Sequence, residues 1–384
     1  MATFKQYEKK DGKKYWMFSA YLGKDPLTGK DRRTTKRGFR TQKEAKLALS
    51  RLQVEIDKKG LHTPNNMTFE ELAELWMSNY QTTVKASTHS RTKIILNKHL
   101  LPKFGKLNVQ KITTAYCQKV VNEWSKTIKQ KRYTLFINYL NKIFKLGINM
   151  RVIEINPITN IIIPQKKEDK IKENKIRHYD KMELEVFLNT IEAEENEFFR
   201  LRDYTLFRLL AFSGCRIGEI LAMTWDDLDF KKKEISINKT VTKGEQYYIS
   251  ETPKTSGSKR TVILDDKTIM QLKRWKLMQM KWLLAHGYNK PSHIFTNDKN
   301  HFTINGAVTE RYKIYRDRAY LHDIGLHGFR HTHASLLFES GASMKEVQER
   351  LGHTNIKTTM DIYTHVTDSK KAETTEKLAN YINF

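Results

Sequence analysis

Two stretches near the end of the sequence gather histidine, arginine and tyrosine, side chains that can bind or attack an electron-poor group. In "GLHGFRHTHASLLF", residues 325–338, His327 and Arg330 stand three apart and share one face of an expected helix. In "RLGHTNIKTTMDIYTHV", residues 350–366, His353 follows a helix-ending glycine, and Tyr363 comes later. A tyrosine hydroxyl becomes a nucleophile when a neighbouring group accepts its proton. Tyr363 is therefore a candidate nucleophile.

The same tyrosine also has a purely structural interpretation. Ile356, Met360 and Tyr363 stand at positions i, i+4 and i+7, a spacing typical of the buried stripe of a helix. On this pattern alone, Tyr363 could be a core aromatic residue.

Two further stretches carry cations that a plain core would not contain. In "SGCRIGEI", Gly214 is expected to end one helix and Arg216 to begin the next, where an arginine beside free backbone N–H groups favours a phosphate. Glu219, three residues on, could hold that guanidinium, or the two could be an ordinary surface ion pair. The loop "TPKTSGSKR" presents Lys254 and Lys259, which could donate a proton to a leaving oxygen or simply be solvated.

A zinc site is the competing interpretation of the histidines. The pattern His-x-x-x-His-x-His, formed by His327, His331 and His333, is rich in metal ligands. His333, however, falls on the apolar side of the expected helix, and no acidic or cysteine ligand stands nearby. We therefore expect no metal and no cofactor, with His331 and His333 as hydrogen-bonded structural residues.

The elements that would position these residues fall into three segments. Residues 1–62 predict a small β-sheet and one helix, with Arg32, Arg33, Lys36 and Arg37 on a strand that could enter a DNA groove or form a solvated basic face. Residues 67–165 predict an all-helical domain, and residues 174–384 a mixed, mostly helical domain. In this last domain, strands at "EISINKTV", "QYYIS" and "RTVIL" are expected to form a meander.

Charge favours a nucleic-acid partner. The chain has 384 residues with 69 Lys and Arg against 43 Asp and Glu, a formal net charge of +26. A chain this basic most often meets DNA or RNA, although a lysine-rich surface alone would give a similar total. No apolar run is long enough for a membrane helix, and the N-terminal residues lack the apolar core of a signal peptide, so we expect a cytoplasmic protein.

Taken together, "SGCRIGEI", "HGFRHTHAS" and "LGHTNIKTTMDIYTHV" resemble the tyrosine recombinase, or phage integrase, family. The resemblance extends into the second segment through "KASTHSRTKIILNKHLLPKFGKLNVQKIT". The first segment is similar to the arm-binding domain of integrases from Gram-positive phages and integrative conjugative elements. The resemblance implies an arm-type DNA-binding domain, a helical core-binding domain and a catalytic domain.

The resemblance also implies a chemistry, in which a tyrosine attacks a DNA phosphodiester to give a 3′-phosphotyrosine and a free 5′-hydroxyl. Carried over by motif, Tyr363 is the nucleophile and Arg216 and Arg330 bind the nonbridging oxygens. His327 would accept a proton and His353 would contact the phosphate. Lys254 would protonate the leaving oxygen, with Lys259 as its rival. Rejoining would need neither metal nor ATP.

The partners implied are double-stranded DNA at core and arm attachment sites and a homotetramer on that DNA. An excisionase and a host DNA-bending protein are further candidates, inside a bacterial host cell. The alternative from another class is a sequence-specific DNA-binding regulator that never cuts. It explains the charge but gives no reason for Arg216, Arg330, His353 and Tyr363 to occur together.

Overall fold

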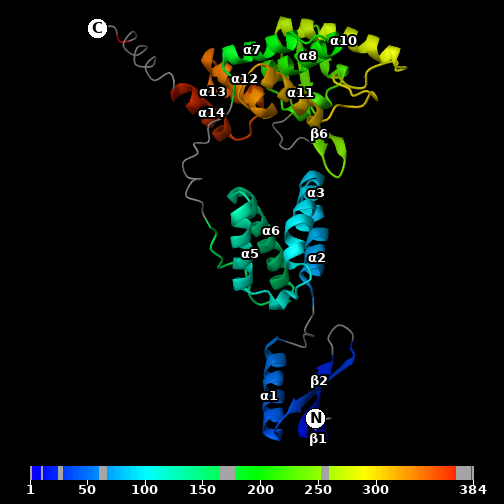
Figure 1. The fold of residues 1–384 in the computed structure, drawn as a ribbon, viewed down its shortest axis with the longest axis vertical. Coiled ribbons are helices and arrows are strands. Elements are labelled where there is room, and N and C mark those ends of the chain that lie inside the picture. The colour runs from blue at the N-terminus through cyan, green and yellow to red at the C-terminus, as the bar shows by residue number, and fades with distance from the viewer. Residues whose placement is uncertain are drawn as a thin grey trace. The chain divides into compact units, whose positions relative to one another are not determined.

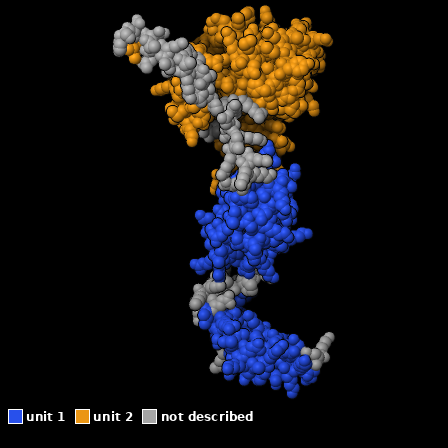
Figure 2. Space-filling view, turned by 60° about the vertical axis from the view of Figure 1, so that its left-hand side comes forward, with its two compact units in different colours: residues 1–80, 95–164 blue, residues 81–94, 165–384 orange. Residues whose placement is uncertain are grey.

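The structure is a computed structural model that describes residues 2–9, 12–24, 29–59, 67–164, 178–251, 259–368 and 382. It divides into two compact units, residues 1–80 with 95–164 and residues 81–94 with 165–384, which Figure 2 colours separately. The predicted domain boundaries, 1–62, 67–165 and 174–384, remain predictions.

The N-terminal module is a three-stranded antiparallel sheet with one helix (Figure 1). Its elements are β1 (Ala2–Glu8), β2 (Lys14–Lys24), β3 (Asp31–Phe39) and α1 (Gln42–Lys59). Side chains alternate between the two faces of β2, and Phe18 and Ala20 are buried against Ala45 and Leu49 of α1. The sheet therefore has one face covered by α1.

The next module is helical. It contains α2 (Phe69–Thr83), η1 (Leu96–Leu100), α4 (Leu101–Phe104), η2 (Val109–Lys111), α5 (Thr114–Thr127) and α6 (Gln130–Asn149). Between α2 and η1 lies α3 (Ala86–Ile95), most of which belongs to the second compact unit. Thr68 and Glu71 form a capping interaction at the start of α2, in which the Glu71 backbone N–H donates to Thr68 Oγ1 at 3.3 Å. Helices α2, α5 and α6 contribute aromatic residues to one core, including Phe69, Trp124 and Phe144.

The C-terminal module is built mostly from helices. These are α7 (Lys181–Glu192), α8 (Glu197–Ser213), α9 (Ile217–Ala222), η4 (Trp225–Asp227), α10 (Asp266–Ala285), α11 (Asn305–Arg318), α12 (Gly325–Glu339), α13 (Met344–Leu351) and α14 (Ile356–Asp368). Helix α8 packs against α7, α10 and α12 and is buried over most of its length (Figure 1). Helix α8 therefore forms the centre of the module, against which the elements of the site pack.

The strands of this module do not form the predicted meander. They are β4 (Leu228–Asp229), β5 (Glu234–Ile237), β6 (Thr240–Lys243), β7 (Tyr247–Ser250) and β8 (Arg260–Ile263). The stretch expected to be one strand is two, and β5 pairs directly with β4 and β8 while β6 and β7 form a separate hairpin. Ile235 of β5 lies directly opposite Val262 of β8 and both side chains are buried, and this cross-strand apolar pair favours β8 over the next strand in sequence.

The predicted fold class is confirmed in all three modules: a small sheet with a helix, a helical module, and a mixed, mostly helical module. Within the described ranges, no helix is long and apolar enough to cross a membrane.

Candidate functional site

The first element of the site is the sharp turn between α8 and α9. Gly214 ends α8 with a φ of 64°, a left-handed conformation in which glycine carries little strain, as the sequence predicted. Arg216 follows as the residue that precedes α9. Its backbone N–H does not remain available for an anion, because it donates to Glu219 Oε2 at 2.9 Å. The phosphate-binding capacity of this turn therefore lies in the Arg216 side chain.

Glu219 holds two arginines at once. Its carboxylate accepts from Arg216 Nη1 at 2.7 Å and from Arg260 Nη2 at 3.1 Å. Burial of this carboxyl group favours its neutral form, but Arg260 and Arg216 outweigh burial and hold its pKa below the ordinary value. The surface ion pair considered from the sequence is thus a largely buried network that fixes the Arg216 guanidinium.

Arg330 is the second phosphate-binding candidate and is almost fully buried, with 1% of its surface exposed. It donates from Nη1 to the Gly214 carbonyl at 2.8 Å and from Nη2 to the Leu351 carbonyl at 2.7 Å. Nε has no acceptor among the described residues. A guanidinium has five N–H donors, so the two carbonyls leave three for a ligand. Burial, with Arg216 and Arg260, lowers the Arg330 pKa to about 9, which still leaves it charged at neutral pH.

Two histidines on α12 lie beside this arginine. The rings of His327 and His331 meet edge to face with centroids 4.8 Å apart. Burial of the His327 ring lowers its pKa most, and the positive charges of Arg330 and Arg216 lower it further. The ring is therefore neutral and able to accept a proton. His331 Nδ1 has no hydrogen-bond partner among the described residues, so the hydrogen bond expected there is not found at that atom.

His353 comes directly after α13, as expected. Ser343 and Glu346 form the capping box that starts this helix, and Gly352 ends it with a φ of 69°. His353 Nδ1 lies 2.9 Å from the Thr359 hydroxyl, which orients the ring. Burial, followed by Arg330 and Arg216, lowers the His353 pKa to about 3, so the ring is neutral in ordinary buffers.

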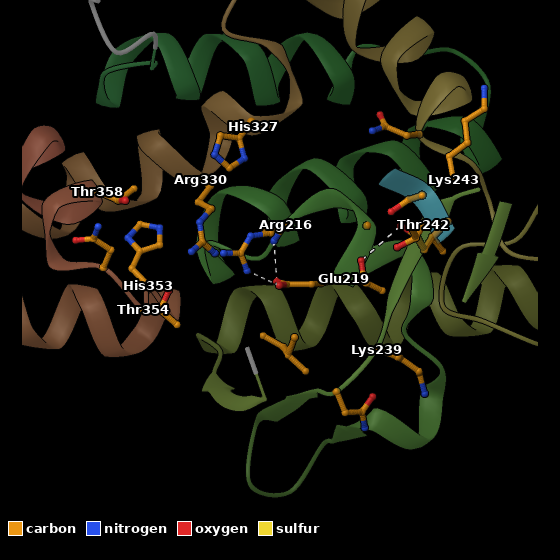
Figure 3. A pocket seen from close by; sticks show the side chains of 18 residues that line it. Arg216, Glu219, Lys239, Thr242, Lys243, His327, Arg330, His353, Thr354 and Thr358 are labelled. Atoms are coloured by element: carbon orange, nitrogen blue, oxygen red, sulfur yellow. Dashed lines mark hydrogen bonds and ion pairs between the residues drawn. The ribbon is translucent and has the colours of Figure 1, made fainter. Parts of the chain in front are cut away.

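The structure brings four of the predicted residues to one pocket. Arg216, His327, Arg330 and His353 all line it, although they come from three separate segments of the chain. Figure 3 shows the side chains of Arg216, Arg330 and His353 pointing toward one another, with His327 alongside. One buried guanidinium group, a second guanidinium held by a carboxylate, and two neutral imidazoles together suit the binding of a phosphate diester that is to be attacked.

Tyr363 is on α14 and is not one of the residues that line this pocket. Its ring packs edge-on against Phe338 at 5.1 Å and is 40% exposed. The core interpretation of its stripe is wrong, because Ile356 and Met360 are 54% and 53% exposed. The buried residues of α14 are Thr359 and Ile362, which define a different face. Tyr363 is therefore accessible on the helix that follows His353.

Of the two lysine candidates, Lys254 lies outside the described residues. Its rival Lys259 is exposed and lines a neighbouring pocket together with Arg260 and His353. The main pocket also includes Lys239, whose ammonium pairs with Asp227 at 2.7 Å, and Lys243 on the β6–β7 hairpin. The sequence pattern contained no signal for either.

The four basic residues predicted on the N-terminal sheet are divided between its two faces. Directly paired residues of an antiparallel sheet point to the same side. Arg33 pairs with Tyr21 and Arg37 with Met17, whereas Lys36 pairs with Phe18, whose side chain is buried under α1. Arg33 and Arg37 therefore lie on the face without a helix, and Arg32 and Lys36 alternate to the α1 side.

Three family models match successive parts of the chain. One described as "Phage integrase family" matches residues 177–370. The others are "Phage integrase, N-terminal SAM-like domain", at residues 68–125, and "Arm DNA-binding domain", at residues 4–56. Together the three models follow the three modules in order.

Similar proteins match over nearly the whole chain. The ICEBs1 integrase of Bacillus subtilis is 28% identical over 93% of this chain and 95% of its own length. A "Tyrosine recombinase XerC-like" protein of Caldanaerobacter subterraneus is 30% identical over 96% of this chain and 97% of its own.

Two solved structures share the fold. The lambda integrase dimer bound to a COC′ core site has a TM-score of 0.59 at 16% identity and covers 93% of this chain and 94% of its own. The Tn1549 transposon integrase in complex with transposon right end DNA has a TM-score of 0.61 at 21% identity, covering 82% and 100%.

Proposed function

This chain belongs to the phage integrase family of tyrosine recombinases, and we propose that its pocket holds the scissile phosphate of a DNA site while Tyr363 attacks it. The chain is a site-specific DNA recombinase, an enzyme that cuts and rejoins DNA strands. The roles of the individual residues are our assignment.

The observation that carries this assignment is the convergence of Arg216 and Arg330 on one pocket with His327 and His353. Arg330 keeps three N–H donors beyond those given to backbone carbonyls, and Arg216 is steadied by Glu219. Paired guanidinium groups would bind the nonbridging oxygens and stabilise the charge that grows on them in the transition state. His353 would donate a further hydrogen bond to the same phosphate.

In the cleavage step, the Tyr363 hydroxyl oxygen bonds to phosphorus and the bond from phosphorus to the 5′ oxygen breaks. His327, neutral because of its lowered pKa, accepts the phenolic proton. Lys254 donates a proton to the departing 5′ oxygen, with Lys259 as the alternative donor. The products are a 3′-phosphotyrosine and a 5′-hydroxyl. Attack by a 5′-hydroxyl of another strand reverses the step, so the bond energy is conserved without ATP or a metal.

Because Tyr363 does not line the pocket, cleavage requires α14 to bring it to the phosphate. The exposure of its ring and the position of α14 just after His353 are compatible with such a movement. DNA bound in the pocket would supply the free energy that favours the competent arrangement.

For the other modules, we assign arm-site binding to the N-terminal sheet and core-site binding to the helical and catalytic modules. The relatives' structures include a lambda integrase tetramer on a Holliday junction, and we propose a homotetramer on DNA here. We further propose that the enzyme integrates and excises a mobile element in the bacterial cytoplasm. An excisionase and a host DNA-bending protein would assist these reactions.

The test is a covalent adduct on DNA in the presence of EDTA. Purified protein is incubated with its flanking DNA, or with a nicked suicide substrate, and the reaction is stopped in detergent. We expect an adduct with the wild-type chain and none with Tyr363→Phe at equal DNA affinity. Tight DNA binding without an adduct on either substrate, or an adduct with the phenylalanine variant, would contradict the assignment of Tyr363.

A further inference from the structure

We propose that Arg350, held by His333, is a positioning residue for strand cleavage, because it fixes the turn to which both phosphate-binding arginines and His353 are attached. The inference rests on the proposed function of the pocket. Neither residue lines that pocket, so neither is assigned a contact with DNA.

The Arg350 side chain joins the last turn of α13 to three other elements. Nε donates to His333 Nε2 on α12 at 3.0 Å. Nη2 donates to the carbonyl of Phe212 at the end of α8, at 3.2 Å, and to the carbonyl of Ile263 on β8, at 2.9 Å. One guanidinium therefore connects α13 to α8, β8 and α12.

His333 is built to accept from this arginine. It is 6% exposed, and its Nδ1 lies 2.7 Å from the carbonyl oxygen of Ala211. A carbonyl oxygen can only accept and a guanidinium nitrogen can only donate. Nδ1 must therefore carry the proton while Nε2 offers its lone pair to Arg350, which defines a neutral ring in one tautomer.

The turn that Arg350 fixes holds both arginines of the pocket, one directly and one through other residues. Arg330 donates to the Leu351 carbonyl at 2.7 Å, one residue after Arg350. Arg260 donates to the Arg350 carbonyl at 3.0 Å and to Glu219, which in turn holds Arg216. His353 is two residues beyond Leu351 on the same chain segment. A shift of this turn would consequently move Arg330 and His353 directly and Arg216 through Glu219.

Small shifts of this kind matter for phosphoryl transfer, which depends on positioning. A displacement of about 1 Å in a group far from the reacting atoms can cost about 100-fold in rate. A lysine at position 350 keeps the charge but has no planar fork, so it cannot reach the two carbonyls and His333 together. Cleavage should therefore suffer more than DNA binding when Arg350 is replaced.

The experiment compares full-length variants in single-turnover adduct formation on a nicked suicide substrate, with DNA affinity and melting temperature measured in parallel. The Arg350→Lys variant is expected to form adduct at least about ten-fold more slowly than wild type, with DNA affinity within about three-fold. Arg274→Lys is the matched control, since Arg274 is an exposed arginine on α10, and its rate should be unchanged.

Three replacements of His333 separate positioning from general packing. His333→Leu removes both interactions, His333→Gln can restore an acceptor near the Nε2 position, and His333→Asn can restore only the donor to Ala211. Recovery of the cleavage rate by Gln beyond that of Asn and Leu, at similar melting temperatures, is the expected result. Equal rates for Gln and Asn, or a wild-type rate for Arg350→Lys, would overturn the proposal. An adduct with wild type and none with Tyr363→Phe keeps the proposed function standing in either case.

Discussion

The carbonyl oxygen of Gly214 accepts a hydrogen bond of 2.8 Å from Nη1 of Arg330, a residue 116 positions later in the chain. The same glycine ends α8 in a left-handed conformation, with a φ of 64°. A Cβ at this position would lie 2.5 Å from His333 Cδ2 and 2.7 Å from Leu351 Cδ2. Gly214 thus ends α8, allows His333 and Leu351 to approach closely, and anchors Arg330, for which we propose a phosphate-binding role.

Gly214→Ala is therefore expected to lower stability by at least about 2 kcal/mol, from left-handed strain and the clash with His333. The melting temperature of the full-length chain would report this loss, and adduct formation should fall with it. Gly306→Ala is the control, because an added Cβ there meets nothing within 4 Å. Equal melting temperatures for the two variants would contradict the prediction.

A second prediction concerns the buried carboxylate of Glu219. Glu219→Gln keeps the shape but removes the carboxylate charge with which the largely buried Arg260 guanidinium pairs. Removing one partner of a buried ion pair costs on the order of 3 kcal/mol, so the melting temperature should drop and Arg216 should lose its fixed position. Glu310→Gln, which breaks an exposed pair with Lys313, should change stability by less than about 1 kcal/mol. A melting temperature for Glu219→Gln as high as that of the control would show that the network is not stabilising.

The lowered pKa values of three histidines predict that the protein loses stability in mild acid. Burial lowers the pKa of His331 and His333 to about 4 and of His353 to about 3, all below the ordinary 6.5. The unfolded chain consequently binds protons first as pH falls, which favours unfolding. Stability is thus expected to be complete above about pH 6.5 and to decline continuously toward pH 4.

Melting temperatures measured between pH 7.5 and 4.5 check this prediction. The window lies above the range in which the carboxyl groups of Glu219 and Asp227 titrate, because the pKa of each is lowered. The decline should be shallower for His333→Gln, which removes one of the titrating rings. A melting temperature independent of pH down to 4.5 would refute the histidine contribution.

The two faces of the N-terminal sheet predict unequal roles for its basic residues. If the helix-free face enters a DNA groove, Arg37→Ala and Arg33→Ala should each weaken arm-site binding by about ten-fold, equivalent to about 1.4 kcal/mol. Lys36→Ala, on the same strand but the α1 side, is the matched control and should have a smaller effect. Binding assays on an isolated arm site measure the difference, while core-site cleavage should be unaffected. Equal losses at Lys36 and Arg37 would argue against recognition by one face.

Much of the local structure was predictable because its determinants stand within one or two helical turns of each other. The ends of α8 and α13 follow from Gly214 and Gly352, and the start of α13 from the Ser343–Glu346 spacing. The same holds for β2, whose alternating pattern puts Phe18 and Ala20 on one face, the face that is buried. The presence of Arg216, His327, Arg330 and His353 at one site was likewise predicted, through motifs that resemble a family.

Other features depend on contacts between residues far apart in the chain, which local patterns do not encode. The sequence pattern predicted a buried stripe of Ile356, Met360 and Tyr363 on α14, whereas packing against α12 and α13 buries Thr359 and Ile362 instead. The pairing of β5 with β8 and the coupling of Arg350 to His333 are of the same kind. The order of residue types along the chain predicted the chemistry. The positions of the arginines, in contrast, depend on carbonyl oxygens that only long-range folding brings within hydrogen-bond distance.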